Sequence, residues 1–173
     1  MRYRASMLAV ALTSLAWTSI AAAQPKHPTA EDVAADIRRI GAETVIRRLD
    51  ETRQLDWIYD QMAEGRAEWI ALAPKLEPGT ALAAAPAEDL GIALAAGLAK
   101  NPQAVLRALS PEGWTISARR VCSVPFTELE APADFAAYKR RATAALLSVK
   151  DPSLAATRDQ CLAELRESQW RGG

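Results

Sequence analysis

"APADFAAYKRRATAALLSVKDPSLAATRDQCLAEL", residues 131–165, is the stretch that decides the fold. Its apolar residues recur every three or four positions, which is the period of a helix packed against a core. They form two rows: Phe135, Tyr138, Ala142, Ala145, Leu146 and Val149, then Leu154, Cys161, Leu162 and Leu165. Asp151-Pro152 separates the rows, and proline after a capping residue is a common helix start. The stretch therefore predicts two helices, at 132–150 and 152–169.

The rest of the chain carries the same helix signals. The 173 residues include only 8 glycines, and no segment alternates apolar and polar residues as a strand does. Thr29 and Asp32 have the spacing of a capping box, and Asn101 precedes a proline. We predict an all-α fold, a single domain of about seven or eight short helices. The expected helices are 30–40, 42–50, 53–64, 66–77, 87–100, 102–109, 132–150 and 152–169.

Two consecutive segments, 55–65 and 67–79, each contain a Trp-Ile step and end at glycine. This similarity indicates that the helices stack as pairs. Residues 111–131 lack helical periodicity and are predicted to form an irregular connector.

The N-terminus has the three parts of a secretory signal peptide. Arg2 and Arg4 precede an uncharged, largely apolar run at 7–20, and three alanines follow at 21–23. An uncleaved membrane anchor is the alternative, but the run is shorter than the ~20 residues that a spanning helix needs. We therefore predict a signal peptide at 1–23, a flexible tail at 24–28 and a single helical domain at 29–173. The mature protein is expected in the periplasm, without membrane insertion after cleavage.

Charge and size exclude several classes of partner. Removing 23 residues from 173 leaves 150, and losing two arginines leaves 19 basic against 21 acidic residues, a net charge of −2. A chain of this length can bury one substantial core. Without a basic run, the sequence predicts no binding to nucleic acid.

Cys122 and Cys161 are the two cysteines of the chain. In an exported protein, two cysteines without a third favour one disulfide bond. A redox pair would be expected to have C-x-x-C spacing, and a nucleophilic thiolate would need a nearby histidine. We therefore expect a structural bridge that ties the connector to the last helix.

Catalytic groups are scarce. The one histidine, His27, lies in the expected tail, which argues against Ser-His-Asp, Cys-His and histidine-ligated metal chemistry. No cofactor-binding motif is present either. Four acidic residues recur at helical spacing and are expected to line an exposed face rather than to form a catalytic pair: Asp56, Asp60, Glu64 and Glu68. We predict a protein that is not an enzyme, with no catalytic residues, no metal and no cofactor.

Trp114 is the best candidate for a surface that binds another protein. It follows the turn signal "SPEG", and tryptophan is enriched at binding hot spots. Arg119 and Arg120 follow and could anchor an acidic partner, although a solvated pair is the alternative. The basic run at 139–141 is expected to be a solvated face.

Four segments carry a resemblance to known proteins: "GRAEWIALAPKLEPGT" (65–80), "NPQAVLRAL" (101–109), "VCSVPF" (121–126) and "RDQCLAEL" (158–165). They resemble small exported all-helical proteins of proteobacteria, and the overall layout is similar to that of periplasmic immunity proteins of the type VI amidase class. The resemblance implies an all-helical exported domain, often with a disulfide, and no functional residue is carried over from it.

Three hypotheses for function follow. The first is a non-catalytic periplasmic protein that binds another protein, as an immunity or inhibitor protein against a toxin or envelope hydrolase. The second is a structural or assembly accessory of an envelope or secretion complex. The third is a carboxylate-dependent cell-wall hydrolase, which would need two suitably placed acidic residues.

Overall fold

The computed structural model describes residues 27–81, 84–123 and 132–169. All regular structure in these residues is helical, which confirms the all-α fold. The helices of seven or more residues are α1 (Ala30–Ile40), α2 (Ala42–Glu51), α3 (Gln54–Ala63), α5 (Ala73–Thr80), α6 (Ala84–Leu98), α7 (Pro102–Ala108), α9 (Pro132–Ser148) and α10 (Ala155–Glu167). Shorter turns of helix are α4 (Ala67–Ile70), α8 (Ala118–Cys122) and the 3-10 helix η1 (Pro152–Leu154). The predicted signal peptide lies outside the described residues.

Side-chain caps start the helices where the sequence predicts them. The Thr29 hydroxyl accepts from the Asp32 backbone N–H at 3.1 Å, and the Asp32 carboxylate accepts from the Thr29 N–H at 3.2 Å. Asn101 accepts from the Ala104 N–H at the start of α7, and Asp151 caps η1. These bonds satisfy backbone donors that have no partner within the helix.

Two predictions of secondary structure were wrong. The helix expected at 66–77 is broken into α4 and α5, because Pro74 lacks the N–H of a helix interior and instead starts a new helix. The connector expected at 111–131 contains α8, which Ser117 caps by accepting from the Arg120 N–H. A five-residue helix is too short to show periodicity.

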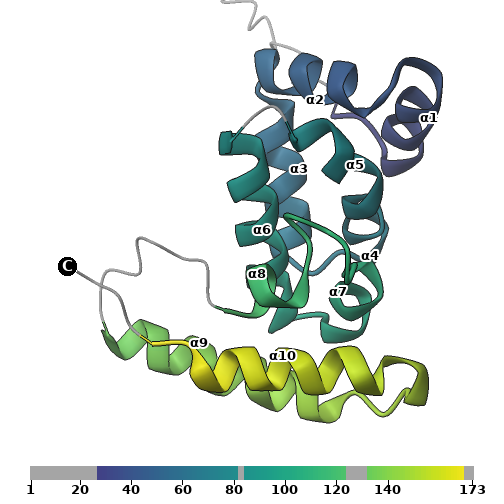
Figure 1. Cartoon of the computed structure of the whole chain (residues 1–173). Coiled ribbons are helices and arrows are strands. Elements are labelled where there is room, and N and C mark those ends of the chain that lie inside the picture. Colours follow the sequence, from purple (N-terminus) through teal and green to yellow (C-terminus); the bar gives the residue numbers. More distant parts are fainter. Residues whose placement is uncertain (1–26, 82–83, 124–131, 170–173) are drawn as a thin grey trace, which may run out of the picture.

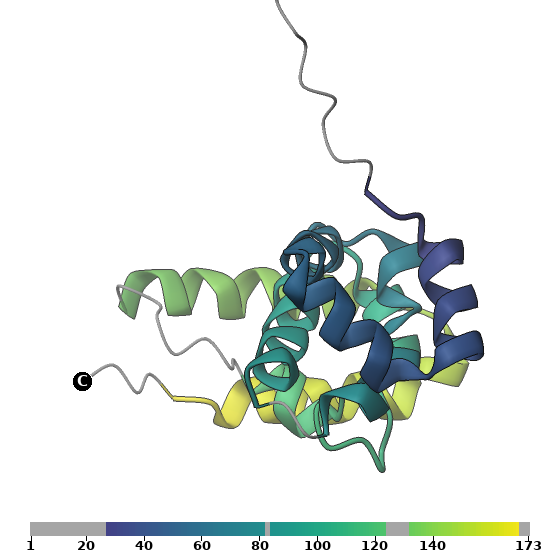
Figure 2. The same ribbon diagram turned by 90° about the horizontal axis from the view of Figure 1, so that it is seen from above.

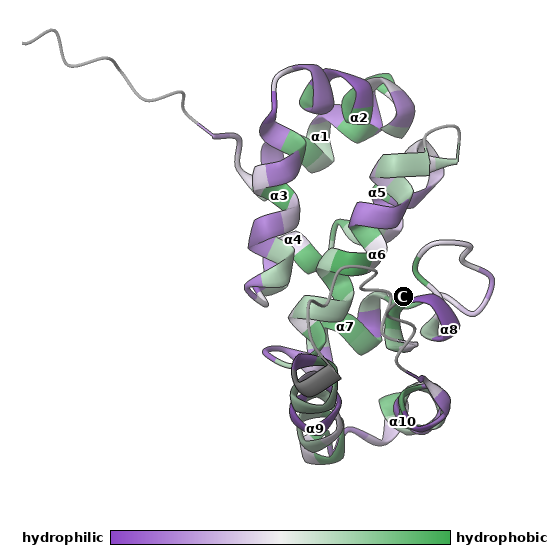
Figure 3. Cartoon of the chain, turned by 90° about the vertical axis from the view of Figure 1, so that its left-hand side faces the viewer, coloured by the Kyte–Doolittle hydropathy of each residue, from purple (hydrophilic) through white to green (hydrophobic). Residues whose placement is uncertain are grey.

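The helices form a body made of α1 to α8, with α9 and α10 lying side by side along one end of it (Figures 1 and 3). Seen from above in Figure 2, the body lies in front of this pair of helices. The most extensive contacts between helices join α3 with α6 and α2 with α5, which are not consecutive in the chain. α8 packs on α10, and α7 packs on α9.

Two glycines allow these non-consecutive helices to approach closely. A Cβ added at Gly79 of α5 would lie 2.6 Å from the backbone carbon of Ala42 in α2. A Cβ added at Gly97 of α6 would lie 2.5 Å from the backbone oxygen of Met62 in α3. Only a residue without a side chain fits at either contact.

The two rows of apolar residues that predicted α9 and α10 face the core. The buried members are Tyr138, Ala142 and Leu146 in α9, Val149 directly after it, Leu154 in η1, and Cys161 and Leu165 in α10. The Tyr138 hydroxyl donates to the Ala95 carbonyl of α6 at 2.8 Å, which ties α9 to the body. The core is therefore continuous from the body into the final pair of helices.

An aromatic stack holds the first described residues. The His27 ring lies parallel to the Trp57 ring with centroids 4.2 Å apart, and Trp57 meets Trp69 edge to face at 5.1 Å. The end of the predicted tail thus lies against α3, while residues 24–26 are outside the described part.

The basic run at 139–141 is only partly solvated. Arg140 and Arg141 are exposed as predicted. Lys139, however, donates from Nζ to the Ser168 carbonyl at 2.8 Å and to the Arg166 carbonyl at 3.3 Å. A lysine at a helix C-terminus satisfies carbonyls that have no partner within the helix. The prediction of an outward-facing Lys139 was therefore wrong.

The predicted disulfide between Cys122 and Cys161 is present, with a Cα–Cα distance of 5.2 Å. Both residues are fully buried, and they join α8 to α10 across 39 positions of sequence. A disulfide of this kind indicates an oxidising compartment. Among the described residues, no helix has the length and apolar character needed to cross a bilayer.

Candidate protein-binding surface

The loop between α7 and α8 carries the predicted binding residue Trp114. Two backbone bonds close this loop, from the Ser110 N–H to the Ile116 carbonyl at 3.1 Å and from the Gly113 N–H to the Ser110 carbonyl at 3.2 Å. Trp114 is 75% exposed, whereas the next two residues, Thr115 and Ile116, are buried. The loop is therefore a defined turn.

Glu77 of α5 anchors this loop to the body. Its Oε1 accepts from the Thr115 N–H at 2.7 Å and from the Ile116 N–H at 3.0 Å. A Cβ added at Gly113 would lie 3.0 Å from the same oxygen, so glycine gives the loop room to approach the carboxylate. Hydrogen bonds to a charged acceptor are among the stronger ones in proteins.

The sequence contains no signal for the Glu77 anchor. Glu77 lies 38 positions before Thr115, and a single acidic residue on a half-buried helix face has many equivalent interpretations. Only the packing of α5 beneath the loop shows which backbone groups it serves.

Arg120 lies over the Trp114 ring, with its guanidinium carbon 5.5 Å from the ring centroid. Such a cation–π contact is worth about 0.5–1 kcal/mol at an exposed site. Trp114 belongs to the loop and Arg120 to α8, so the contact spans the Ser117 cap. Arg119 is exposed on the same helix. We call Trp114, Arg119 and Arg120 the Trp114 surface.

The disulfide fixes the helix that carries the two arginines. α8 has only five residues, too few for an isolated helix to be stable. Its last residue, Cys122, is bonded to Cys161 of α10, and Val121 is fully buried beside it. One end of the Trp114 surface is thus held by Glu77 and the other by the disulfide.

This arrangement suits recognition of a polypeptide. An exposed indole offers a large flat apolar area at low conformational cost, and the neighbouring guanidinium groups can pair with carboxylates. Since both supports hold the surface before binding, little ordering entropy remains to be lost.

The acidic residues that run from α3 to α4 are exposed, as predicted: Asp56, Asp60, Glu64 and Glu68. Glu64 pairs with Lys100 at 2.8 Å, and this bond lowers the pKa of the Glu64 carboxyl. In α6, Asp89 is exposed, and partial loss of solvent together with the negative charges of Asp56 and Glu88 raises the pKa of its carboxyl. Asp89 is therefore the carboxylate whose environment most favours the protonated form among those that the structure describes.

Metal-binding geometry is missing from this part of the chain. Within residues 27–81, 84–123 and 132–169, no three His, Cys, Asp or Glu side chains are grouped so that they could hold an ion.

Comparisons with known proteins found no matching family model, no matching curated protein and no matching solved structure. The resemblance to periplasmic immunity proteins therefore stays a prediction.

Proposed function

We propose that this protein is a non-catalytic periplasmic protein that binds another protein through the Trp114 surface. The observation that carries the proposal is a 75% exposed tryptophan on a loop held by two charge-assisted hydrogen bonds. Tryptophan and arginine, which lie side by side here, are among the residue types most enriched at binding hot spots. The guanidinium groups beside it favour an acidic partner surface.

Within this class we propose an immunity or inhibitor role, in which the bound partner is a toxin or an envelope hydrolase. The buried disulfide supports export to an oxidising compartment, where such partners act. A rigid, preformed surface on a small domain suits stoichiometric blocking of an enzyme.

A pull-down of tagged protein from periplasmic extract, with cross-linking and mass spectrometry, tests the proposal. Trp114→Ala should weaken capture of the partner about 30-fold, as expected for loss of a hot-spot tryptophan. Arg120→Ala should weaken capture less than Trp114→Ala does. Arg140→Ala serves as the matched control, because Arg140 is an exposed arginine of α9. Equal capture by all three variants would contradict the proposal.

One observation keeps the cell-wall hydrolase as a second candidate. The pKa of Asp89, an exposed carboxyl of α6, is raised, which is the direction that a general acid requires. A zymogram with peptidoglycan would show clearing that Asp89→Asn abolishes if this candidate were right.

The assembly role predicts a different result in the pull-down, namely capture of several subunits of one envelope complex instead of one partner.

A further inference from the structure

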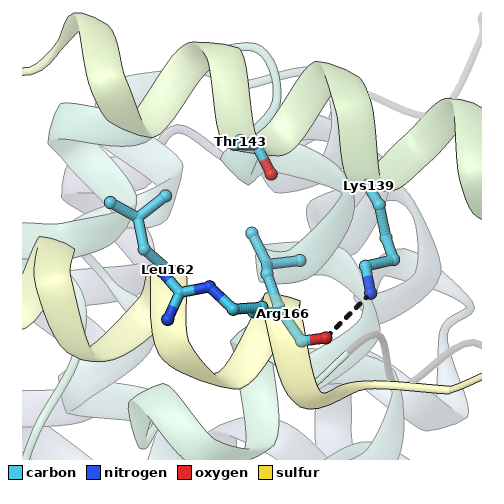
Figure 4. A pocket seen from close by; sticks show the side chains of 5 residues that line it. Lys139, Thr143, Leu162 and Arg166 are labelled. Atoms are coloured by element: carbon cyan, nitrogen blue, oxygen red, sulfur yellow. Dashed lines mark hydrogen bonds between the residues drawn. The ribbon is translucent and has the colours of Figure 1, made fainter.

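The pair of helices at the end of the molecule forms a groove that the Trp114 surface does not include. Between α9 and α10 lies a hollow of about 270 Å³, lined by Lys139, Thr143, Leu162, Leu165 and Arg166. In Figure 4, Lys139 and Thr143 come from α9 and face Leu162 and Arg166 on α10. The lining thus combines two cations and a hydroxyl with an apolar wall.

An exposed leucine lies outside this lining on the same face of α9. Lys139, Thr143 and Leu147 are each four residues apart and so lie in one row on the helix surface. Leu147 is 55% exposed, and it and Trp114 are the exposed large apolar side chains of the described residues. A ligand held at Lys139 and Thr143 would therefore have an exposed apolar side chain beside it on the same helix face.

Both cations of the groove keep hydrogen-bond donors that a ligand could use. Arg166 is exposed and forms no ion pair with any acidic residue in the described part of the chain. Lys139 Nζ uses two of its three donors on the carbonyls of Arg166 and Ser168, which hold the ammonium group in place. A carboxylate in the groove would meet a fixed ammonium group and an available guanidinium group.

We infer that the α9–α10 groove binds a segment of a polypeptide in which an acidic residue stands beside an apolar one. Lys139, Arg166 and the Thr143 hydroxyl bind the carboxylate, and Leu162 and Leu147 contact the apolar side chain. Charge complementarity favours this occupant, because two cations and an apolar wall line the same groove. This goes beyond the proposed function, since it concerns a second surface that can be tested without the partner.

Selection of a phage-displayed library of random twelve-residue peptides on the purified protein tests this inference. We expect selected peptides to contain Asp or Glu next to a large apolar residue. Arg166→Gln should weaken binding of a selected peptide about tenfold, as for loss of a charge-assisted hydrogen bond. Arg140→Gln, on the exposed part of the same helix pair, should leave binding unchanged, and so should Trp114→Ala.

Amide chemical shifts of the wild-type protein give a second readout that does not depend on any variant. A selected peptide should shift the amide signals of Thr143, Leu162 and Arg166. The inference is overturned if no peptide is selected, if the peptides lack acidic residues, or if the shifts lie elsewhere. It is also overturned if the Arg166→Gln and Arg140→Gln variants bind a selected peptide equally. A further contrary result would be a shift of these amides by sodium hexanoate, a small apolar carboxylate, when peptides cause none. Loss of peptide binding on Trp114→Ala would assign the peptides to the Trp114 surface instead.

Discussion

Replacing Glu77 by alanine removes the acceptor for the backbone N–H groups of Thr115 and Ile116. Both residues are buried, with exposed fractions of 1% and 0%. Each buried donor left without a partner costs about 1–3 kcal/mol. Glu77 itself is only half-buried, so water reaches part of this site, and we expect a total loss of about 2–4 kcal/mol. For a domain of this size, that lowers Tm by about 5–15 °C.

Urea unfolding followed by far-UV circular dichroism measures this loss. Glu77→Gln should cost less than Glu77→Ala, because the amide oxygen still accepts but carries no charge. Glu68→Ala is the matched control, since Glu68 is exposed on the neighbouring α4, and its effect should stay within about 0.5 kcal/mol.

The same variants test whether the Trp114 surface is held before binding. If Glu77 holds the loop, Glu77→Ala should also weaken partner capture under conditions where the variant is fully folded. A Glu77→Ala protein as stable as Glu68→Ala would refute the anchoring role of the two hydrogen bonds.

Three further results are expected. Gly97→Ala should lower the urea midpoint, because its Cβ would lie 2.5 Å from a backbone oxygen of α3, whereas Gly91→Ala meets its nearest atom at 3.7 Å and should stabilise by up to about 1 kcal/mol. Since partial loss of solvent and the charges of Asp56 and Glu88 raise the folded pKa of Asp89 above its ordinary value of 3.8, charged Asp89 costs stability at neutral pH. Asp89→Asn should therefore raise Tm at pH 7, and this gain should shrink as the pH falls through the raised pKa and vanish below 3.8. Replacing both Cys122 and Cys161 by alanine opens a loop of 39 positions and should cost about 4 kcal/mol in chemical unfolding. In the wild type, alkylation after treatment with reductant should label neither cysteine until urea is added, because the disulfide is fully buried.

Local sequence was sufficient to predict the helices that have their own start signals. Thr29, Asn101 and Asp151 each accept from a backbone N–H two or three residues later, so the information lies within one turn of chain. The two apolar rows of the final helices were equally local, because burial of one helix face repeats with the helix period. The disulfide followed from there being two cysteines and from the expected export.

The candidate site depended on contacts between distant residues. Trp114 was predicted as exposed because it follows a turn, but its support comes from Glu77, which lies 38 positions before Thr115. Lys139 was predicted to face solvent. It instead donates to the carbonyl of Ser168 at the end of α10, which lies 29 positions later in the chain. Local periodicity describes which side of a helix is apolar, but it does not describe what lies opposite the polar side.

The composition, caps and periodicity of this chain determine that it folds as a bundle of short helices with one bridge. These properties act over one or two helical turns and are present in any arrangement of the same helices. The pairing of α3 with α6 and of α2 with α5, the hold of Glu77 on the Trp114 loop, and the groove between α9 and α10 arise only on packing. Each requires the backbone of one helix to lie within a few ångströms of another, and that distance is set by the packing of the whole core.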